Sequence, residues 1–326
     1  MSSQECLILI VYLTVSDLKK IETVFGIFFQ TMEHFFETCP LDTIPKEKLV
    51  FQKCISYGSN SHSRVLRGTY NNTSCIAKEY VIEEWDESSL SETLEDCSAL
   101  TSRFKREECR HFMYPLGYCK TEKYIYLVYE DTNSQGLYSY IERDKFWEQV
   151  EEDETGMYTY QNDTILWNYL MKTPEKYEII RQMILCVQEL HSMDLIHLDI
   201  KTDNFVIQEK TKHVHLVDYD TIHSFNGERI QLKQRLGTLG YRSLEHESLS
   251  VGKEDDIYAL GVSMVEVWTG EIWEEGESFK SCRNEVLKRI REIEKNDPKV
   301  GKLFRDCVSL RSKKRPTINQ IYERIK

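Results

Sequence analysis

Residues 195–220 constrain the fold of this chain more than any other stretch, because polar clusters alternate there with short apolar runs. The segment "HLDIKTDNF" carries Asp199 between two such runs. Two strand-like runs around "EKTK" follow, and the second ends at Asp218, 19 residues further on (218 − 199). Either acid alone suits a surface turn. An aspartate at the end of the apolar run "VHLVDYD" instead favours a loop held between a helix and a strand, and a hairpin between the two acids would bring both to one cleft.

The order of the predicted elements indicates an α+β chain with two lobes. Residues 49–78 show the pattern of strands, and "TYNNTSC" predicts a hairpin because asparagine tolerates a left-handed backbone. A helix is expected over 88–104, and "YIYLVYE" is typical of a short buried strand. "TPEKYEIIRQMILCVQELHSMDL" contains an amphipathic helix, and residues 256–269 are apolar almost all round, which predicts a helix inside a core. A β-rich first part therefore precedes a larger helical part.

Two segments fall outside this pattern. Residues 1–47 are an apolar-rich extension expected to pack on the main body, and their run "LILIVYL" is shorter than the roughly 20 apolar residues that a membrane-spanning helix needs. Residues 144–173 hold an acidic insert, "EQVEEDETG", interpreted as a solvated loop. The main domain is placed at 48–326, with the first lobe at about 48–132 and the second at about 133–326.

Charge and cysteine content narrow the classes of function. The net charge is −12, so no basic excess points to nucleic-acid binding as the main function. The ten cysteines form no C-x-x-C pair, which argues against a zinc ribbon or a thioredoxin-like motif. In a chain this long the default is reduced thiols, which predicts an intracellular location in the cytoplasm or nucleus.

Five motifs in order give the chain a resemblance to a known family. "GSNSHSRV", "CIAK", "HLDIKTDN", "DYD" and "SLE" match, in sequence, a glycine-rich loop, a strand lysine, a catalytic loop, a metal motif and the end of an activation segment. Over roughly residues 48–326 the chain thus resembles the eukaryotic-type protein kinases. The resemblance implies a bilobal kinase-like fold, ATP and Mg²⁺ as cofactors, and a protein substrate.

The resemblance also implies roles for individual residues. Asp199 matches the aspartate that accepts or orients the proton of the substrate hydroxyl, and Lys201 would lie near the transferring phosphate. Asn204 and Asp218 would bind Mg²⁺, a hard cation that suits carboxylate and amide oxygens. Lys78 matches the lysine that holds the α- and β-phosphates.

The remaining ATP residues depart further from the family pattern. Only one family glycine persists in the phosphate loop, although asparagine tolerates positive φ. Tyr129 stands at the gatekeeper position, before the backbone that reads adenine. The expected ATP contacts, besides Lys78, are Gly58, Asn60, Ser63, Val65, Glu130 and Thr132.

Further residues are expected to support the catalytic and metal-binding residues and the ATP contacts. The partner of Lys78 would be a glutamate of the following helix, either Glu95 or Glu92. Glu245 would pair with Arg315, and Asp256 would brace the catalytic loop from the long buried helix.

Several features bear on the kind of kinase. Lys201 and Gly237-Thr238 resemble serine/threonine kinases, whereas Leu198 stands where arginine is usual and Asp220 where glycine is usual. These departures resemble those of divergent viral or protist kinases, and a viral chain would act in the host cell. A pseudokinase that binds nucleotide or serves as a scaffold is the main alternative. A small-molecule kinase is less favoured, because the activation segment suits a polypeptide substrate.

Overall fold

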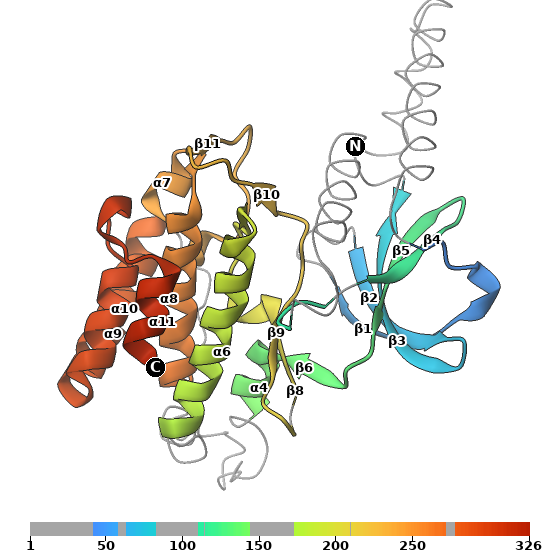
Figure 1. Cartoon of the computed structure of the whole chain (residues 1–326), viewed down its shortest axis with the longest axis horizontal. Helices are drawn as coiled ribbons and strands as arrows, with labels where there is room; N and C mark the ends of the chain where they lie inside the picture. Colours follow the sequence, from blue (N-terminus) through green and yellow to red (C-terminus); the bar gives the residue numbers. More distant parts are fainter. Residues whose placement is uncertain are drawn as a thin grey trace, which may run out of the picture.

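A computed structural model of the chain describes residues 42–57, 63–82, 110–113, 115–143, 173–208, 210–271 and 278–326. Figure 1 shows a β-sheet lobe beside a larger helical lobe, with a small sheet near the junction of the two. The predicted bilobal α+β fold is therefore confirmed. The helix expected over 88–104, part of the glycine-rich loop and residues 144–172 of the insert lie outside the described residues.

The first lobe is built on a five-stranded sheet in which every neighbouring pair is antiparallel. Its order is β1-β2-β3-β5-β4, and its strands are β1 (Leu49–Tyr57), β2 (Ser63–Tyr70), β3 (Thr73–Val81), β4 (Pro115–Lys120) and β5 (Tyr124–Glu130). The predicted hairpin joins β2 to β3 through Asn71 and Asn72, whose φ angles are 50° and 64°. On β5, Ile125 and Leu127 face the main core, while Tyr126 and Val128 face a second, smaller cluster, as strand alternation requires.

The described end of the predicted extension packs on this sheet. The Ile44 N–H donates to the Tyr118 carbonyl at 2.7 Å, and the Tyr118 N–H donates to the Asp42 carbonyl at 2.9 Å. Ile44 is buried in the smaller cluster, and a short 3₁₀ turn, η1 (Lys46–Lys48), leads from there into β1. Residues 42–47 are thus integrated with the lobe.

The second lobe is helical and holds most of the core. Residues 255–267 of its central helix are all buried, as predicted from their apolar character. The other long helices surround that helix and pack on one another. The α-helices are α4 (Leu137–Arg143), α6 (Thr173–Ser192), α7 (Leu244–Glu247), the central α8 (Lys253–Thr269), α9 (Phe279–Asn296), α10 (Pro298–Cys307) and α11 (Ile318–Ile325).

Short elements position the loops that carry polar residues. The hairpin predicted between Asp199 and Asp218 is present as β8 and β9. The further strand β6 pairs with β8, which gives the order β6-β8-β9. Two more two-stranded pairs, β10 with β7 and β11 with β12, hold the segment that follows it. The strands are β6 (Ser134–Gly136), β7 (Leu195–Ile196), β8 (Phe205–Gln208), β9 (Val214–Leu216), β10 (His223–Ser224), β11 (Ile230–Gln231) and β12 (Ser250–Val251), and the 3₁₀ turns are η3 (Thr202–Asn204), η4 (Leu239–Tyr241) and η5 (Ser312–Lys314).

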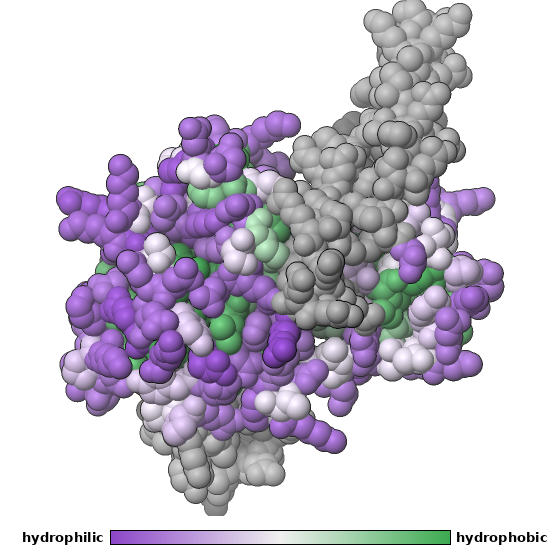
Figure 2. All heavy atoms as spheres, in the orientation of Figure 1, coloured by the Kyte–Doolittle hydropathy of each residue, from purple (hydrophilic) through white to green (hydrophobic). Residues whose placement is uncertain are grey.

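The outer face of the helical lobe is mainly hydrophilic in Figure 2, with small hydrophobic areas between polar side chains. Within the part of the chain that the structure describes, none of the helices has the length and apolar character needed to cross a membrane.

Two buried histidines predict a fall in stability at acid pH. Burial lowers the pKa of His215 to about 4, with a smaller effect from the neighbouring His213, and burial together with Arg242 lowers the pKa of His246 to about 4. Because both folded-state values lie below the ordinary 6.5, the unfolded chain binds protons first as the pH falls. The stabilisation is thus present above about pH 6.5 and is lost progressively toward pH 4.

We therefore expect the free energy of unfolding, measured by urea titration at several pH values, to decrease from pH 7 to pH 4. Each histidine contributes a slope of up to about 1.4 kcal/mol per pH unit. His215→Phe keeps an aromatic ring against His213 and should reduce the slope by that amount. An unchanged slope in this variant would contradict the assignment to His215.

Candidate active site

The loop between β7 and β8 is anchored by hydrogen bonds to Asp256 on α8. The buried Asp256 accepts hydrogen bonds from the backbone N–H groups of His197 and Leu198, each at 2.9 Å, and its Oδ2 lies 2.9 Å from His191 Nε2. Burial by itself would raise the pKa of Asp256, but these partners together lower it below its ordinary value. A permanent carboxylate therefore holds the loop in place, which is the bracing geometry expected for Asp256.

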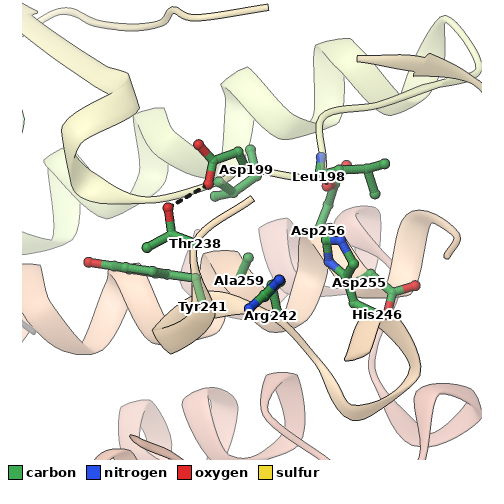
Figure 3. Close-up of a pocket in the computed structure, with 10 residues that line it drawn as sticks. Leu198, Asp199, Thr238, Tyr241, Arg242, His246, Asp255, Asp256 and Ala259 are labelled. Carbon is green, nitrogen blue, oxygen red and sulfur yellow. Dashed lines mark hydrogen bonds between the residues drawn. The ribbon is translucent and has the colours of Figure 1, made fainter. Parts of the chain in front are cut away.

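Asp199 lies above this brace in a small network. Its Oδ1 accepts from Thr238 Oγ1 at 2.9 Å, and its Oδ2 accepts from Asn204 Nδ2 at 3.1 Å and lies 3.3 Å from Lys201 Nζ. Lys201 also donates to Thr238 Oγ1 at 2.9 Å, so the Thr238 hydroxyl contacts both the Lys201 ammonium and the Asp199 carboxylate. Figure 3 shows Asp199 and Thr238 joined by their hydrogen bond in the lining of a pocket that also includes Tyr241.

Thr238 is a site residue that the sequence interpretation missed. The sequence marked it only as a sign of serine/threonine kinases, yet it contacts both Asp199 and Lys201. Its neighbour Gly237 has φ +69°, and a Cβ there would come within 2.2 Å of the Leu198 carbonyl oxygen. Glycine is therefore needed for Thr238 to approach the loop so closely.

The second group of polar residues gathers around Lys78 on β3. Lys78 Nζ lies 2.5 Å from Asp218 Oδ1 and 2.6 Å from Asp220 Oδ2, and the Tyr80 hydroxyl donates to Asp220 Oδ1 at 2.9 Å. Burial by itself would lower the pKa of Lys78, but the two carboxylates raise it above its ordinary value. The predicted partners Glu95 and Glu92 lie outside the described residues.

Asn204 connects the two groups. Its side-chain amide donates to the backbone carbonyl and Oδ2 of Asp199, at 2.8 and 3.1 Å, and its backbone carbonyl accepts from the Val217 N–H at 2.9 Å. Asn204 is thereby held beside the residue that precedes Asp218. Because Nδ2 faces Asp199, the amide oxygen is turned away from Asp199.

This donor set fits Mg²⁺. An amide oxygen of Asn204 and a carboxylate of Asp218 are hard ligands, and Mg²⁺ bound with a nucleotide takes its remaining ligands from phosphates and water. In the described parts of the chain, no three histidine, cysteine or acidic side chains converge as a metal cage. The arrangement therefore suits a shared metal–nucleotide site better than a structural metal.

Of the predicted ATP residues that the structure describes, Val65 lies next to Lys78 on the sheet, and the others lie on β2 or at the end of β5 and after it. Val65 is directly opposite Lys78 in the β2–β3 register, and the buried Ser63 begins β2. Glu130 ends β5, and the Thr132 hydroxyl lies 2.7 Å from Ser134 Oγ. Gly58 and Asn60 lie outside the described residues.

The predicted ion pair between Glu245 and Arg315 is present in the helical lobe, with Glu245 Oε2 at 2.7 Å from Arg315 Nη2. Glu245 Oε1 accepts from the Ser312 N–H at 2.9 Å, and Arg315 donates to the backbone carbonyls of Ser309 and Glu254 at 2.9 and 3.0 Å. The Arg315 side chain is completely buried. The pair therefore ties the end of the 218–245 segment to the helical core.

Comparison with known proteins agrees with this geometry. The protein kinase domain family matches residues 56–324, which is most of the chain. The chain belongs to the protein kinase family. ATP and Mg²⁺ use and protein substrates are general properties of that family.

Individual relatives of this kinase domain are distant. It is 26% identical over 276 residues to wall-associated receptor kinase-like 18 of Arabidopsis thaliana, covering 77% of this chain and 31% of that protein. It is 34% identical over 104 residues to a G-type lectin S-receptor-like serine/threonine-protein kinase of the same plant, covering 30% and 13%. For citron rho-interacting kinase of Rattus norvegicus the identity is 29% over 140 residues, covering 40% and 7%. The chain thus spans less than a third of each of these relatives.

The activation segment of the kinase domain is held by apolar contacts next to the catalytic loop. Leu198, at the position of the usual arginine, is buried and has φ +67°. Arg229 of the segment lies 2.9 Å from Asp255 and 3.3 Å from Glu254 at the start of α8. The apolar cluster consists of Ile196, Leu198, Leu232 and Val251, with Phe225, Ile230, Leu236 and Leu249 packed against it.

The segment 218–220, which resembles the metal motif of the family, is anchored through Tyr219. Its hydroxyl donates to the Leu216 carbonyl at 2.6 Å and accepts from the Met113 N–H at 3.0 Å. Its ring lies 5.9 Å from that of Phe112 and 6.5 Å from that of His197. The hydroxyl that distinguishes tyrosine from the usual phenylalanine therefore adds polar contacts, a role that the sequence pattern did not indicate.

Proposed function

We propose that this kinase domain transfers the γ-phosphoryl group of ATP to serine or threonine hydroxyls of protein substrates. The observation that carries the proposal is the link through Asn204 between the Asp199–Lys201–Thr238 network and the residues next to Asp218. Phosphoryl transfer depends chiefly on positioning and electrostatic stabilisation, and both depend on such a rigid arrangement.

Each residue would contribute to positioning or to charge stabilisation. Asp199, with its carboxylate oriented by Thr238 and Asn204, would accept or orient the proton of the acceptor hydroxyl. Lys201 would stabilise charge that develops on the transferring group. Lys78 would hold the α- and β-phosphates, and Asn204 with Asp218 would hold Mg²⁺. Bound Mg²⁺ neutralises charge on the phosphates.

Selectivity for serine and threonine rests on the same network. Lys201 and Thr238, which resemble their counterparts in serine/threonine kinases, are in direct contact. One relative carries "serine/threonine-protein kinase" in its name. Because the matched part covers only 30% of this chain, the choice of serine and threonine as acceptor residues belongs to the proposal.

The setting of the enzyme is likewise proposed from the sequence. Residues 48–326 are taken as the catalytic domain and 1–47 as an extension, with an intracellular location and protein rather than nucleic-acid partners. A viral or protist origin stays a prediction.

The second candidate is a pseudokinase that binds nucleotide or serves as a scaffold. The specific observation in its favour is that both Asp218 and Asp220 hold Lys78, which a nucleotide must engage. In this case ATP would bind without transfer, or not at all.

The deciding experiment incubates the purified chain of residues 1–326 with labelled ATP and Mg²⁺, with and without mixed serine, threonine and tyrosine peptides. We expect label in serine or threonine peptides that is abolished by EDTA. Label only in tyrosine peptides would overturn the acceptor class. A thermal shift with ATP but no label in any acceptor would support the pseudokinase.

Activity is expected to be independent of phosphorylation in the activation segment. In many family members the arginine before the catalytic aspartate pairs with a phosphate on this segment, a charge-assisted pair that can order it. Here Leu198 packs in an apolar cluster that includes residues of the segment itself. Treatment with a phosphatase should therefore leave the transfer rate within about twofold, and a loose exposed ion pair, worth only about 0–1 kcal/mol, would change it by at most about fivefold.

The matching measurement is mass spectrometry of the segment before and after treatment, with the rate measured on both samples. A tenfold loss, about 1.4 kcal/mol, that is reversed by rephosphorylation would contradict this expectation.

A further inference from the structure

Among the described residues, Lys78 has two carboxylate partners, Asp218 and Asp220, and only Asp218 has been given a role so far. The Lys78 side chain is 12% exposed, and Asp218 and Asp220 lie at 2.5 and 2.6 Å from its Nζ. Under the proposed function, Asp218 must give its oxygens to Mg²⁺. An ammonium that is largely removed from solvent needs a remaining anionic partner, because an unpaired buried charge is strongly unfavourable.

Asp220 is held so that it can be this partner. Its Oδ2 contacts Lys78, and its Oδ1 accepts from the Tyr80 hydroxyl at 2.9 Å. Lys78 and Tyr80 are two residues apart on β3, so their side chains leave the same face of the strand. One strand therefore presents two donors to the two oxygens of one carboxylate. The Tyr80 ring also lies 5.2 Å from Lys78 Nζ, within reach of a cation–π contact.

The backbone accommodates this aspartate without strain. Asp218 has a positive φ of 66°, whereas Asp220 is not among the described residues with positive φ. The position where the family usually has glycine therefore does not require glycine here, and its side chain is directed at Lys78.

We propose that Asp220 is a positioning residue that keeps Lys78 aimed at the nucleotide phosphates. Tyr80 orients its carboxylate, so that Lys78 retains a fixed anionic partner when Asp218 engages the cation. Asp220 thereby takes the part that the family resemblance implied for Glu95 or Glu92. The proposal rests on the proposed function in taking Lys78 as the phosphate-binding lysine and Asp218 as a ligand of Mg²⁺.

The first test needs no nucleotide. Melting temperatures of the full chain are compared for Lys78→Met, Asp220→Asn and the double variant. Lys78→Met leaves two carboxylates facing each other, so it should lower the melting temperature. Adding Asp220→Asn relieves that repulsion, and the double variant should melt above Lys78→Met. Additive losses would show that the two residues are not coupled and would overturn the proposal.

The second test measures nucleotide use. Asp220→Asn should raise the KM for ATP by about tenfold, consistent with weakening one charge-assisted pair. Tyr80→Phe should raise it by a smaller factor, and the midpoint of the Mg²⁺ titration should not move in either variant. Glu292→Gln, which removes a carboxylate from an exposed lysine pair at 2.8 Å on α9, is the matched control and should change neither quantity.

The outcomes separate the proposal from its alternatives. A shifted Mg²⁺ midpoint in Asp220→Asn would make Asp220 a metal ligand and overturn the positioning role. A raised KM in Glu95→Gln or Glu92→Gln, with none in Asp220→Asn, would return that role to Glu95 or Glu92.

The same measurements separate this proposal from the proposed function. If the wild-type chain transfers no phosphate, the proposed function fails, while the melting comparison still decides whether Asp220 positions Lys78. If the wild-type chain is active and Asp220→Asn matches it in KM and melting temperature, only the positioning role fails.

Discussion

Asp199→Asn is expected to lower kcat by about 10²–10⁴-fold while leaving the Kd for ATP within about twofold. In the structure the Asp199 carboxylate is surrounded by donors from Thr238, Asn204 and Lys201, so it is oriented as an acceptor. An asparagine amide is far less basic and also presents an N–H₂ group to these donors. ATP is expected to bind at the other group of residues, around Lys78, and should be retained.

The measurement is kcat with a saturating peptide substrate, together with the Kd for ATP from calorimetry. Asp194→Asn is the matched control, because Asp194 is five residues upstream, is 72% exposed, and has φ 56°, which asparagine tolerates. Near-normal kcat in Asp199→Asn would remove the role assigned to Asp199.

Asp218→Ala should abolish the Mg²⁺-dependent part of ATP binding and lower kcat/KM by about 10³-fold or more, since it removes a ligand of the cation that offsets phosphate charge. It also removes one of the two carboxylates on Lys78. Asn204→Ala should also weaken Mg²⁺-dependent ATP binding and lower kcat/KM, but by less, because a neutral amide offsets none of the charge of the cation.

The thermal shift caused by ATP is measured with Mg²⁺ and with EDTA. The wild-type chain should show a larger shift with Mg²⁺, and Asp218→Ala should show no difference between the two conditions. Equal shifts in the wild-type chain would mean that Asp218 and Asn204 hold no cation, and would favour the pseudokinase.

Much of the fold was predictable from local sequence patterns. Asn71-Asn72 indicated the β2–β3 turn because only residues that tolerate positive φ suit it, and both have that conformation. The apolar run of 256–269 indicated a buried helix, and α8 is buried along most of its length. These features depend on neighbours a few residues away, which a sequence displays directly.

Motif order also predicted Asp199, Lys201 and Asn204 on one loop and Asp218 after the hairpin that follows it, and the structure has this loop and this hairpin. The Glu245–Arg315 ion pair was expected from the family resemblance, not from any local pattern. The roles of these residues remain for the experiments above.

What the tertiary structure decided were contacts between distant segments. Lys78 meets Asp218 and Asp220 across 140 and 142 residues, and Thr238 meets Asp199 across 39. Such pairs depend on how two lobes and an activation segment pack, which the periodicity of any one segment does not encode. For the same reason the sequence showed only that Leu198 replaces the usual arginine. Its place in an apolar cluster became visible only in the structure. The sequence by itself determined the elements and the residue types at the site, and packing decided which charges face each other.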